Sequence, residues 1–184
     1  MSLGGRAAAW VGAASAAAVL AACASVPRGG AERAGEGFSG RLSIRVEAEG
    51  AAPAHSLSAA FDLRGDPSAG RLDLSTPLGS VLAQARWSPS QVVLATPRGQ
   101  TNFSDLDALT REVLGESLPV AALFDWLQGR PWSGAPSKPA IGDSGAGFEQ
   151  LGWAVNLTRF DEALVSARRE SPPPVTVRIK LDRP

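Results

Sequence analysis

Apolar and polar side chains alternate along most of the chain after residue 37. The alternation first covers 38–46 and then returns at 57–63, 72–74, 81–87, 92–95, 153–157 and, most clearly, 175–181. Successive side chains of a β-strand point to opposite faces, so a period of two predicts strands with one buried and one solvated face. Turn segments such as Arg64-Gly65-Asp66-Pro67 separate the stretches, which favours an antiparallel meander over βαβ units.

The period changes between residues 104 and 129. Ser104-Asp105 is typical of a helix start, apolar residues then recur at helical spacing, and Gly115 is typical of a helix end. A second helix, almost entirely apolar, is expected from Pro119 to Leu127, with Gly129 as its end. Residues 131–147 are rich in Gly, Pro and Ser, and we expect a loop there.

These elements together predict a mainly β (α+β) fold. An antiparallel sheet with one apolar face must bury that face, and two short helices are a natural cover. A curved sheet with helices across its mouth encloses an apolar cavity if the side chains between them leave space. The expected folded domain covers residues 38–184.

Residues 1–22 have the character of a secretory signal. Arg6 supplies a positive charge, and the apolar stretch after it is too short and Ala-rich for a convincing membrane span. The stretch ends in Leu20-Ala21-Ala22-Cys23, which resembles the bacterial lipobox, where the Cys receives a diacylglyceryl group and becomes an acylated N-terminus. Cys23 is the sole cysteine, which favours a lipobox over an ordinary signal followed by a chance Cys. Residues 23–37 would then be the acylated N-terminus and a flexible tether.

Composition argues against several classes of site and partner. Lys and Arg number 18 and Asp and Glu number 18, and this balance argues against a nucleic-acid-binding protein. A single Cys excludes an internal disulfide framework and a Cys-based zinc site, and a single His excludes a multi-His metal site. We therefore expect no metal, and no cofactor apart from the covalent acyl and diacylglyceryl groups on Cys23.

The sequence contains no convincing catalytic grouping. His55 could serve a hydrolase, but no G-x-S-x-G motif frames a nucleophile, and a solvent-exposed His is the favoured interpretation. Asp105 and Asp107 could form a carboxylate pair, but at a helix start they are expected to compensate the helix dipole. Asp125 has apolar neighbours that could raise its pKa, and an acid on the wet face of the helix is the favoured alternative. We expect no catalytic residues and no enzymatic activity.

An unusual leucine stands between two expected strands. Thr76-Pro77-Leu78-Gly79 suits a type I turn, with Leu78 at the third position. Polar residues are usual at the tip of a turn. Leu78 is therefore either an exposed probe for a membrane or partner, or a side chain folded back onto its own sheet, and the pattern leaves both open.

Taken in order, these residues resemble a known family, the outer-membrane lipoprotein receptor LolB. The stretches that carry the resemblance are Phe38-Ser39-Gly40-Arg41-Leu42, Leu74 to Gly79 (LSTPLG), Phe103 to Leu109 (FSDLDAL), Leu118 to Trp132 (LPVAALFDWLQGRPW), Gly152-Trp153 and Val177 to Asp182 (VRIKLD). No single stretch is diagnostic. Their order, combined with the lipobox, is specific to the family.

The resemblance implies an incomplete, strongly curved antiparallel β-barrel with a short helical lid over an apolar cavity. It implies a monomeric binding protein that accepts acylated client lipoproteins from the periplasmic carrier LolA and inserts them into outer-membrane phospholipid. Leu78 matches the exposed Leu that aids delivery in the family. Ala24, following the acylated Cys in place of Asp, implies anchoring in the outer membrane at its periplasmic face.

The resemblance also suggests which side chains meet the acyl chains. By apolarity and position, the candidates for lining the acyl-chain cavity are Trp87, Phe103, Leu106, Leu123, Phe124, Trp126 and Trp153. Large aromatic residues also serve as ordinary core, so a core role stays open for each of them. Two other functions remain as alternatives, a structural lipoprotein that scaffolds an envelope complex without ligand transfer, and a hydrolase that uses His55.

Overall fold

A computed structural model of the chain describes residues 37–51, 53–140 and 146–182. The expected signal (1–22), the expected acylation site Cys23 and all but the last residue of the expected tether (23–37) lie outside the described residues. Gly37, that last tether residue, is the first residue of strand β1.

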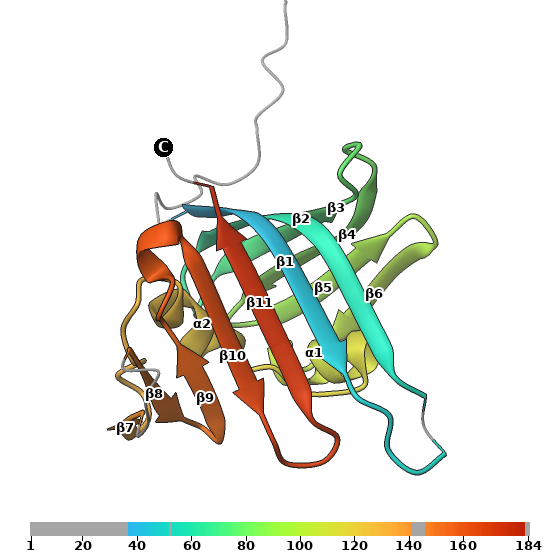
Figure 1. Ribbon diagram of the computed structural model, residues 1–184. Coiled ribbons are helices and arrows are strands. Elements are labelled where there is room, and N and C mark those ends of the chain that lie inside the picture. The colour runs from blue at the N-terminus through green and yellow to red at the C-terminus, as the bar shows by residue number, and fades with distance from the viewer. Residues whose placement is uncertain (1–36, 52, 141–145, 183–184) are drawn as a thin grey trace, which may run out of the picture. The chain divides into compact units, whose positions relative to one another are not determined.

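The described residues form one antiparallel sheet and two α-helices (Figure 1). The strands are β1 (Gly37–Val46), β2 (His55–Gly65), β3 (Gly70–Ser75), β4 (Val81–Ser88), β5 (Gln91–Thr96), β6 (Gly99–Phe103), β7 (Ser137–Pro139), β8 (Gly147–Gln150), β9 (Trp153–Asn156), β10 (Leu164–Arg169) and β11 (Val175–Leu181). Their order across the sheet is β6-β5-β4-β3-β2-β1-β11-β10-β9-β8-β7. The sheet does not close, because β6 and β7 remain its two edges, and the mainly β, incomplete-barrel expectation is confirmed.

The centre of the sheet joins the two ends of the folded region. Strand β1 pairs with β2 on one side and with the C-terminal strand β11 on the other, and Figure 1 shows β1 and β11 side by side. In this register Ile44 lies opposite Val177, and Leu42 lies opposite Ile179. The alternation places these apolar side chains on the inner face, where Ile44, Val177 and Ile179 are buried.

Both helices lie where the change of period predicted them. Helix α1 (Leu106–Leu114) begins after Asp105, whose carboxylate accepts a 2.7 Å hydrogen bond from the N–H of Ala108. It ends at Gly115, which has a left-handed φ of 78°. Helix α2 (Val120–Trp126) follows Pro119 and buries Ala122, Phe124 and Trp126. Among the described residues, no helix has the length and apolarity needed to cross a bilayer.

Several elements lack a period-two pattern strong enough to predict them. The segment 131–147 is not entirely loop, because Ser137–Pro139 forms the edge strand β7 against β8. Strand β6 is polar and largely exposed, and it is held by its ladder with β5. Strand β10 buries only Val165 and the small side chain of Ala167 on its inner face. These strands therefore form because they pair with a neighbouring strand, and not because their own sequence strongly favours a strand.

The core lies on the inner face of the sheet and includes helix α2. Phe124 makes edge-to-face contacts with Trp87 of β4 and with Phe38 of β1, at ring-centroid distances of 6.2 and 6.5 Å. Trp126 contacts Phe148 of β8 and Trp153 of β9, at 6.3 and 6.2 Å. Through these rings α2 packs on both halves of the open sheet.

Asp105 gives α1 a pH-dependent start. The hydrogen bond from the Ala108 N–H, followed by that from the Ser104 hydroxyl, lowers the pKa of Asp105 below its ordinary value. Because the pKa of Asp105 is lower in the folded state, its ionised carboxylate stabilises the fold at pH values above the unfolded-state pKa of about 3.9. This stabilisation is lost as the pH falls through the folded-state pKa. We expect Asp105→Ala to be less stable than wild type in urea at neutral pH, and the difference to shrink in acid. An equal difference at both pH values would contradict this assignment.

Candidate functional site

An apolar cavity of about 110 Å³ lies between the inner face of the sheet and the helical segment. Its walls come from β1 to β5 and β11 on one side and from α1, α2 and their connection on the other. The lining residues are Leu42, Ile44, Leu57, Phe61, Leu63, Leu72, Leu74, Ala83, Ala85, Leu94, Leu109, Thr110, Val113, Leu114, Leu118, Val120, Leu123, Leu127, Val177 and Ile179.

The cavity wall offers no free polar group. Thr110 is the single polar residue in the lining. Its hydroxyl donates to the carbonyl of Asp107 at 3.2 Å and accepts from the N–H of Leu118 at 3.1 Å. A wall of aliphatic side chains and one phenyl ring, that of Phe61, supplies neither a nucleophile nor a base, and it favours a ligand that is itself apolar.

The seven predicted lining residues divide into three groups. Leu123 lines the cavity. Phe103 and Leu106 are partly buried and pack against the core, and the four aromatic residues Trp87, Phe124, Trp126 and Trp153 belong to the buried core itself. None of these six lies in the cavity wall of this structure, and contact with an acyl chain stays a prediction for all seven.

Most of the wall consists of inward aliphatic residues that were not singled out. Leu57, Leu63, Leu72 and Leu74 all occupy the apolar phase of their strands. The alternation identified that phase but could not tell which inward residues meet other side chains and which face a gap. Four of the large aromatic residues that were expected to line the cavity are instead tightly packed in the core.

Gln150 of β8 fixes the end of α2. Its side-chain oxygen accepts from the indole N–H of Trp126 and from the backbone N–H of Trp132, each at 2.9 Å. Its side-chain NH₂ donates to the carbonyls of Trp132 and Ala135 at 2.7 and 2.8 Å. Only 2 % of Gln150 is exposed. Its buried side-chain amide makes four hydrogen bonds and attaches the C-terminal end of α2 to the sheet.

The connection between α1 and α2 has a different attachment. Glu116 accepts a 2.6 Å charge-assisted hydrogen bond from Arg169 of β10. Their side chains are only 23 % and 16 % exposed, and the Arg169 guanidinium also lies 5.6 Å from the ring centroid of Trp153. This ion pair therefore links the connection between α1 and α2 to the sheet. The two helices and this connection are called the helical cover below.

Leu78 projects from the loop between β3 and β4. The N–H of Gly79 donates to the carbonyl of Thr76, and the N–H of Thr76 donates to the carbonyl of Ser80, both at 2.9 Å. These bonds close the expected turn, and Gly79 takes a left-handed φ of 85°. Leu78 is 96 % exposed. The structure thus decides between the two alternatives for Leu78, because the side chain is not folded back onto its sheet.

The remaining candidates for chemistry have ordinary surroundings. His55 is exposed at the start of β2. Asp125 pairs with Arg130 at 2.6 Å, and Asp105 is used as a helix cap. In the part of the chain that the structure describes, no cluster of His, Cys, Asp and Glu has the makings of a metal site.

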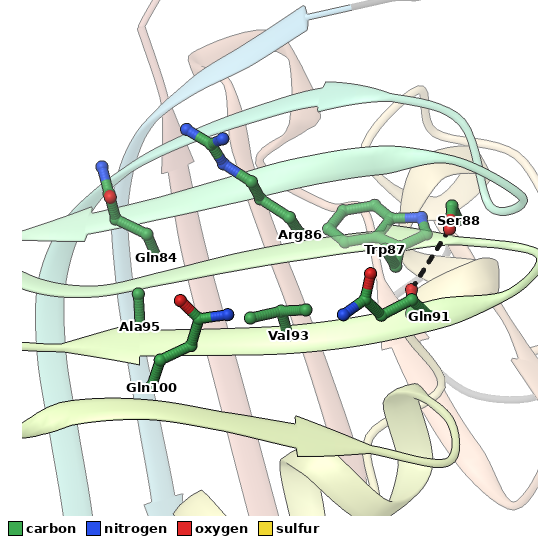
Figure 2. A pocket seen from close by; sticks show the side chains of 8 residues that line it. All are labelled: Gln84, Arg86, Trp87, Ser88, Gln91, Val93, Ala95 and Gln100. Carbon is green, nitrogen blue, oxygen red and sulfur yellow. Dashed lines mark hydrogen bonds between the residues drawn. The ribbon is translucent and has the colours of Figure 1, made fainter. Parts of the chain in front are cut away.

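A second hollow lies over strands β4, β5 and β6, and Figure 2 shows its residues. Gln84 and Arg86 come from β4, Gln91 from β5 and Gln100 from β6, and the Ser88 hydroxyl donates to the Gln91 carbonyl at 3.4 Å. The hollow is lined by amides, a guanidinium, a hydroxyl, the indole of Trp87 and the small apolar side chains Val93 and Ala95. It holds no carboxylate or imidazole that could act as a base beside Ser88.

Comparison with known proteins identifies the family. The family model described as "Outer membrane lipoprotein LolB" matches residues 37–183. This chain belongs to the LolB family. Curated relatives named outer-membrane lipoprotein LolB include those of Bordetella petrii (35 % identical, covering 91 % of this chain and 88 % of the relative) and Bordetella pertussis (36 %, 91 % and 88 %). That of Cupriavidus pinatubonensis is 36 % identical and covers 90 % of this chain and 82 % of the relative.

The LolB match confirms the resemblance drawn from the ordered sequence stretches. Five of the six stretches contribute to the site, since 38–42 contains Leu42 and 103–109 contains Leu109, both in the cavity wall. Residues 74–79 form the end of β3 and the Leu78 loop, 118–132 include α2, and 177–182 include most of β11. The LolB-like stretches thus coincide with the exposed loop and with parts of the cavity wall.

Proposed function

We propose that this LolB-family protein accepts acylated lipoproteins from the periplasmic carrier LolA and inserts them into the outer membrane. The observation that carries the proposal is the aliphatic cavity beneath the helices, whose one polar side chain is already hydrogen-bonded. Such a wall suits acyl chains and offers nothing to a polar substrate. The exposed Leu78 adds an apolar probe on a separate loop, suited to the delivery step.

The anchor in this proposal is Cys23, acylated and placed at the periplasmic face of the outer membrane. One acyl chain gives only marginal membrane binding, whereas two or more hold a protein firmly. The covalent lipid is the only non-protein group that the proposal requires. The activity proposed is binding and transfer, without a catalysed bond change.

Energetics favour transfer from cavity to cavity. Each methylene exposed to water costs about 0.8 kcal/mol, so releasing several acyl chains into the periplasm would cost tens of kcal/mol. Transfer then runs without a nucleotide if this protein binds the chains more tightly than the carrier does, and the bilayer binds them more tightly still.

The cavity must widen when it accepts a chain. A volume of about 110 Å³ is below the 300–1,000 Å³ (approximate range) of ordinary ligand pockets. Moving the sheet strands apart would break many backbone hydrogen bonds between them. Lifting the α1–α2 connection from the sheet would break the Glu116–Arg169 ion pair, which is a smaller loss. We infer that the helical cover moves at this end, while Gln150 holds the end of α2 in place.

A transfer experiment tests the proposal. Full-length protein is reconstituted into vesicles and mixed with a purified complex of LolA and an acylated client, and the position of the client is followed by flotation. We expect the acylated client to move to the vesicles only when this protein is present. A client that stays with LolA while the protein is folded would refute the receptor function and favour an envelope scaffold. Client variants without acyl chains are the control, and should not bind.

Breaking the ion pair at the helical cover should speed ligand entry. We expect Glu116→Gln to raise the association rate of a fluorescent fatty acid about fivefold, since a partly buried ion pair of about 1 kcal/mol no longer holds the cover closed. Stopped-flow fluorescence measures the rate. Arg130→Gln is the matched control. It breaks the ion pair between Asp125 of α2 and Arg130, which follows α2, and this pair does not link the helices to the sheet. Equal rates for wild type and Glu116→Gln would show that the cover does not open at this end.

A further inference from the structure

We propose that the outer face of strands β1 and β11 binds the headgroups of anionic phospholipids beside the Leu78 loop. The proposal rests on the insertion function above and deepens it by naming a lipid class and a second membrane-contacting surface. The surface is called the basic face here and is defined by Arg41, Arg178 and Lys180. All three side chains are exposed, whereas the residues between them on the same strands point into the core.

The three cations of the basic face lie together, and no described carboxylate pairs with any of them. In the sheet register Arg41 lies directly opposite Lys180, and Arg178 is opposite Ser43, two residues further along. Among the described residues, none of the three forms an ion pair with a carboxylate. The Lys180 amine donates to the backbone carbonyl of Glu162, which leaves its charge uncompensated by that contact.

This arrangement is unfavourable for the sheet by itself. Like charges directly opposite each other on one face of an antiparallel pair are destabilising. Elsewhere on β1 and on the neighbouring strand β10 the chain compensates its cations, because Arg45 pairs with Glu47 at 2.9 Å and Arg168 pairs with Glu170 at 2.5 Å. An external anion on the basic face would remove the repulsion between Arg41 and Lys180, and phosphate oxygens are well matched to guanidinium donors.

The position of the basic face indicates which anion it meets. Arg41, Arg178 and Lys180 line one shallow hollow of about 330 Å³, and Pro77 lines the same hollow. Pro77 precedes Leu78, the most exposed large apolar residue described. An apolar probe beside unpaired cations is the combination that suits a bilayer interface, where the leucine reaches acyl chains and the cations meet lipid phosphates. A soluble anionic partner would explain the cations but not the adjoining leucine.

Lipid-dependent docking can be measured on the full-length protein. A dye is attached at Ser56→Cys, an exposed position of β2 that lies opposite Arg45 of β1 and outside the basic face, and the protein is reconstituted into vesicles carrying a headgroup-labelled acceptor lipid. Labelling of wild type checks that Cys23 does not react. We expect energy transfer to be greater in phosphatidylcholine with phosphatidylglycerol than in phosphatidylcholine alone. The difference should decline with added salt, because exposed charges are screened beyond about 8 Å at physiological ionic strength.

Paired variants separate specific docking from general charge. Arg41→Gln with Arg178→Gln should shift the docked-to-free ratio on anionic vesicles about 25-fold, because each cation near an anionic leaflet contributes about fivefold. Arg45→Gln with Arg168→Gln removes the same charge from β1 and the neighbouring strand β10, but from residues paired with Glu, and is expected to have a much smaller effect. Equal energy transfer in both lipids, or equal loss in both variants, would overturn the proposal.

Client insertion is measured in the same vesicles. If docking assists delivery, the Arg41→Gln, Arg178→Gln variant should lose the acceleration by phosphatidylglycerol and keep the insertion rate found in phosphatidylcholine. Absence of insertion in both lipids, with docking intact, would refute the proposed transfer function while leaving the basic face established. Lipid-independent docking with normal insertion would refute the basic face alone.

Discussion

Replacing Leu78 by Glu is expected to slow insertion of an acylated client into vesicles at least about tenfold, while leaving the fold and the acceptance of the client from LolA intact. Burial of a leucine side chain contributes about 1.5–3 kcal/mol, and a carboxylate adds the cost of placing a charge in hydrocarbon. The fold should tolerate the change because Leu78 is 96 % exposed and its turn is closed by backbone hydrogen bonds. Flotation of the client with the vesicles measures insertion, and pull-down measures acceptance.

A matched control distinguishes a loop effect from a general loss of surface apolarity. Leu151 is 46 % exposed in the turn between β8 and β9, so Leu151→Glu makes the same chemical change away from the β3–β4 loop. We expect this variant to insert clients at the wild-type rate. Wild-type insertion by Leu78→Glu would remove Leu78 from the delivery step. A failure of Leu78→Glu to accept clients would instead place the side chain at the contact with the carrier.

Replacing Gln150 by Leu is expected to destabilise the fold by about 3 kcal/mol. The change removes four hydrogen bonds and leaves the buried indole N–H of Trp126 without its partner. A buried polar group that loses its partner costs about 1–3 kcal/mol, and the loss at Trp132 and Ala135 adds to this despite the apolar area gained from Leu. Urea unfolding followed by tryptophan fluorescence gives the free energy of unfolding.

The control for Gln150 is a glutamine that the fold does not use in this way. Gln100 is exposed on the edge strand β6, and Gln100→Leu should change the free energy of unfolding by less than about 0.5 kcal/mol. Destabilisation of Gln150→Leu by less than about 1 kcal/mol would show that the hydrogen bonds of this amide are replaced by other groups. In that case α2 would not be fixed at its C-terminal end in the way inferred here.

The parts of the fold that sequence predicts are those with a strong local signal. Alternation over residues 38–46 and 175–181 predicted β1 and β11, because an apolar phase is required wherever one face of a strand is buried. Ser104-Asp105 and Gly115 predicted the ends of α1, and the structure shows that Asp105 is the residue that caps its start. Strand β7 was missed because a short edge strand carries little propensity of its own and forms only against β8.

The candidate site also has one part that the sequence predicts and another that only the structure shows. The turn pattern predicts an unusual role for Leu78, but only the structure shows that its side chain is exposed and not folded back onto the sheet. The cavity wall could not be identified among the inward residues, because Leu72 and Trp87 have the same phase and differ only in what packs against them. Phe124 fills the space beside Trp87, whereas Leu72 faces the gap under the helices.

By itself, the sequence determined an antiparallel sheet with one apolar face, two short helices to cover it and a leucine in the turn between two strands. These follow from periodicity, capping and turn chemistry, which act over a few residues. Only the tertiary structure decided that β1 pairs with β11 and so joins the two ends of the folded region, that Glu116 contacts Arg169, and that Arg41 lies opposite Lys180. Those contacts join residues more than 50 positions apart, and strand pairing and packing bring them together, which no local pattern encodes.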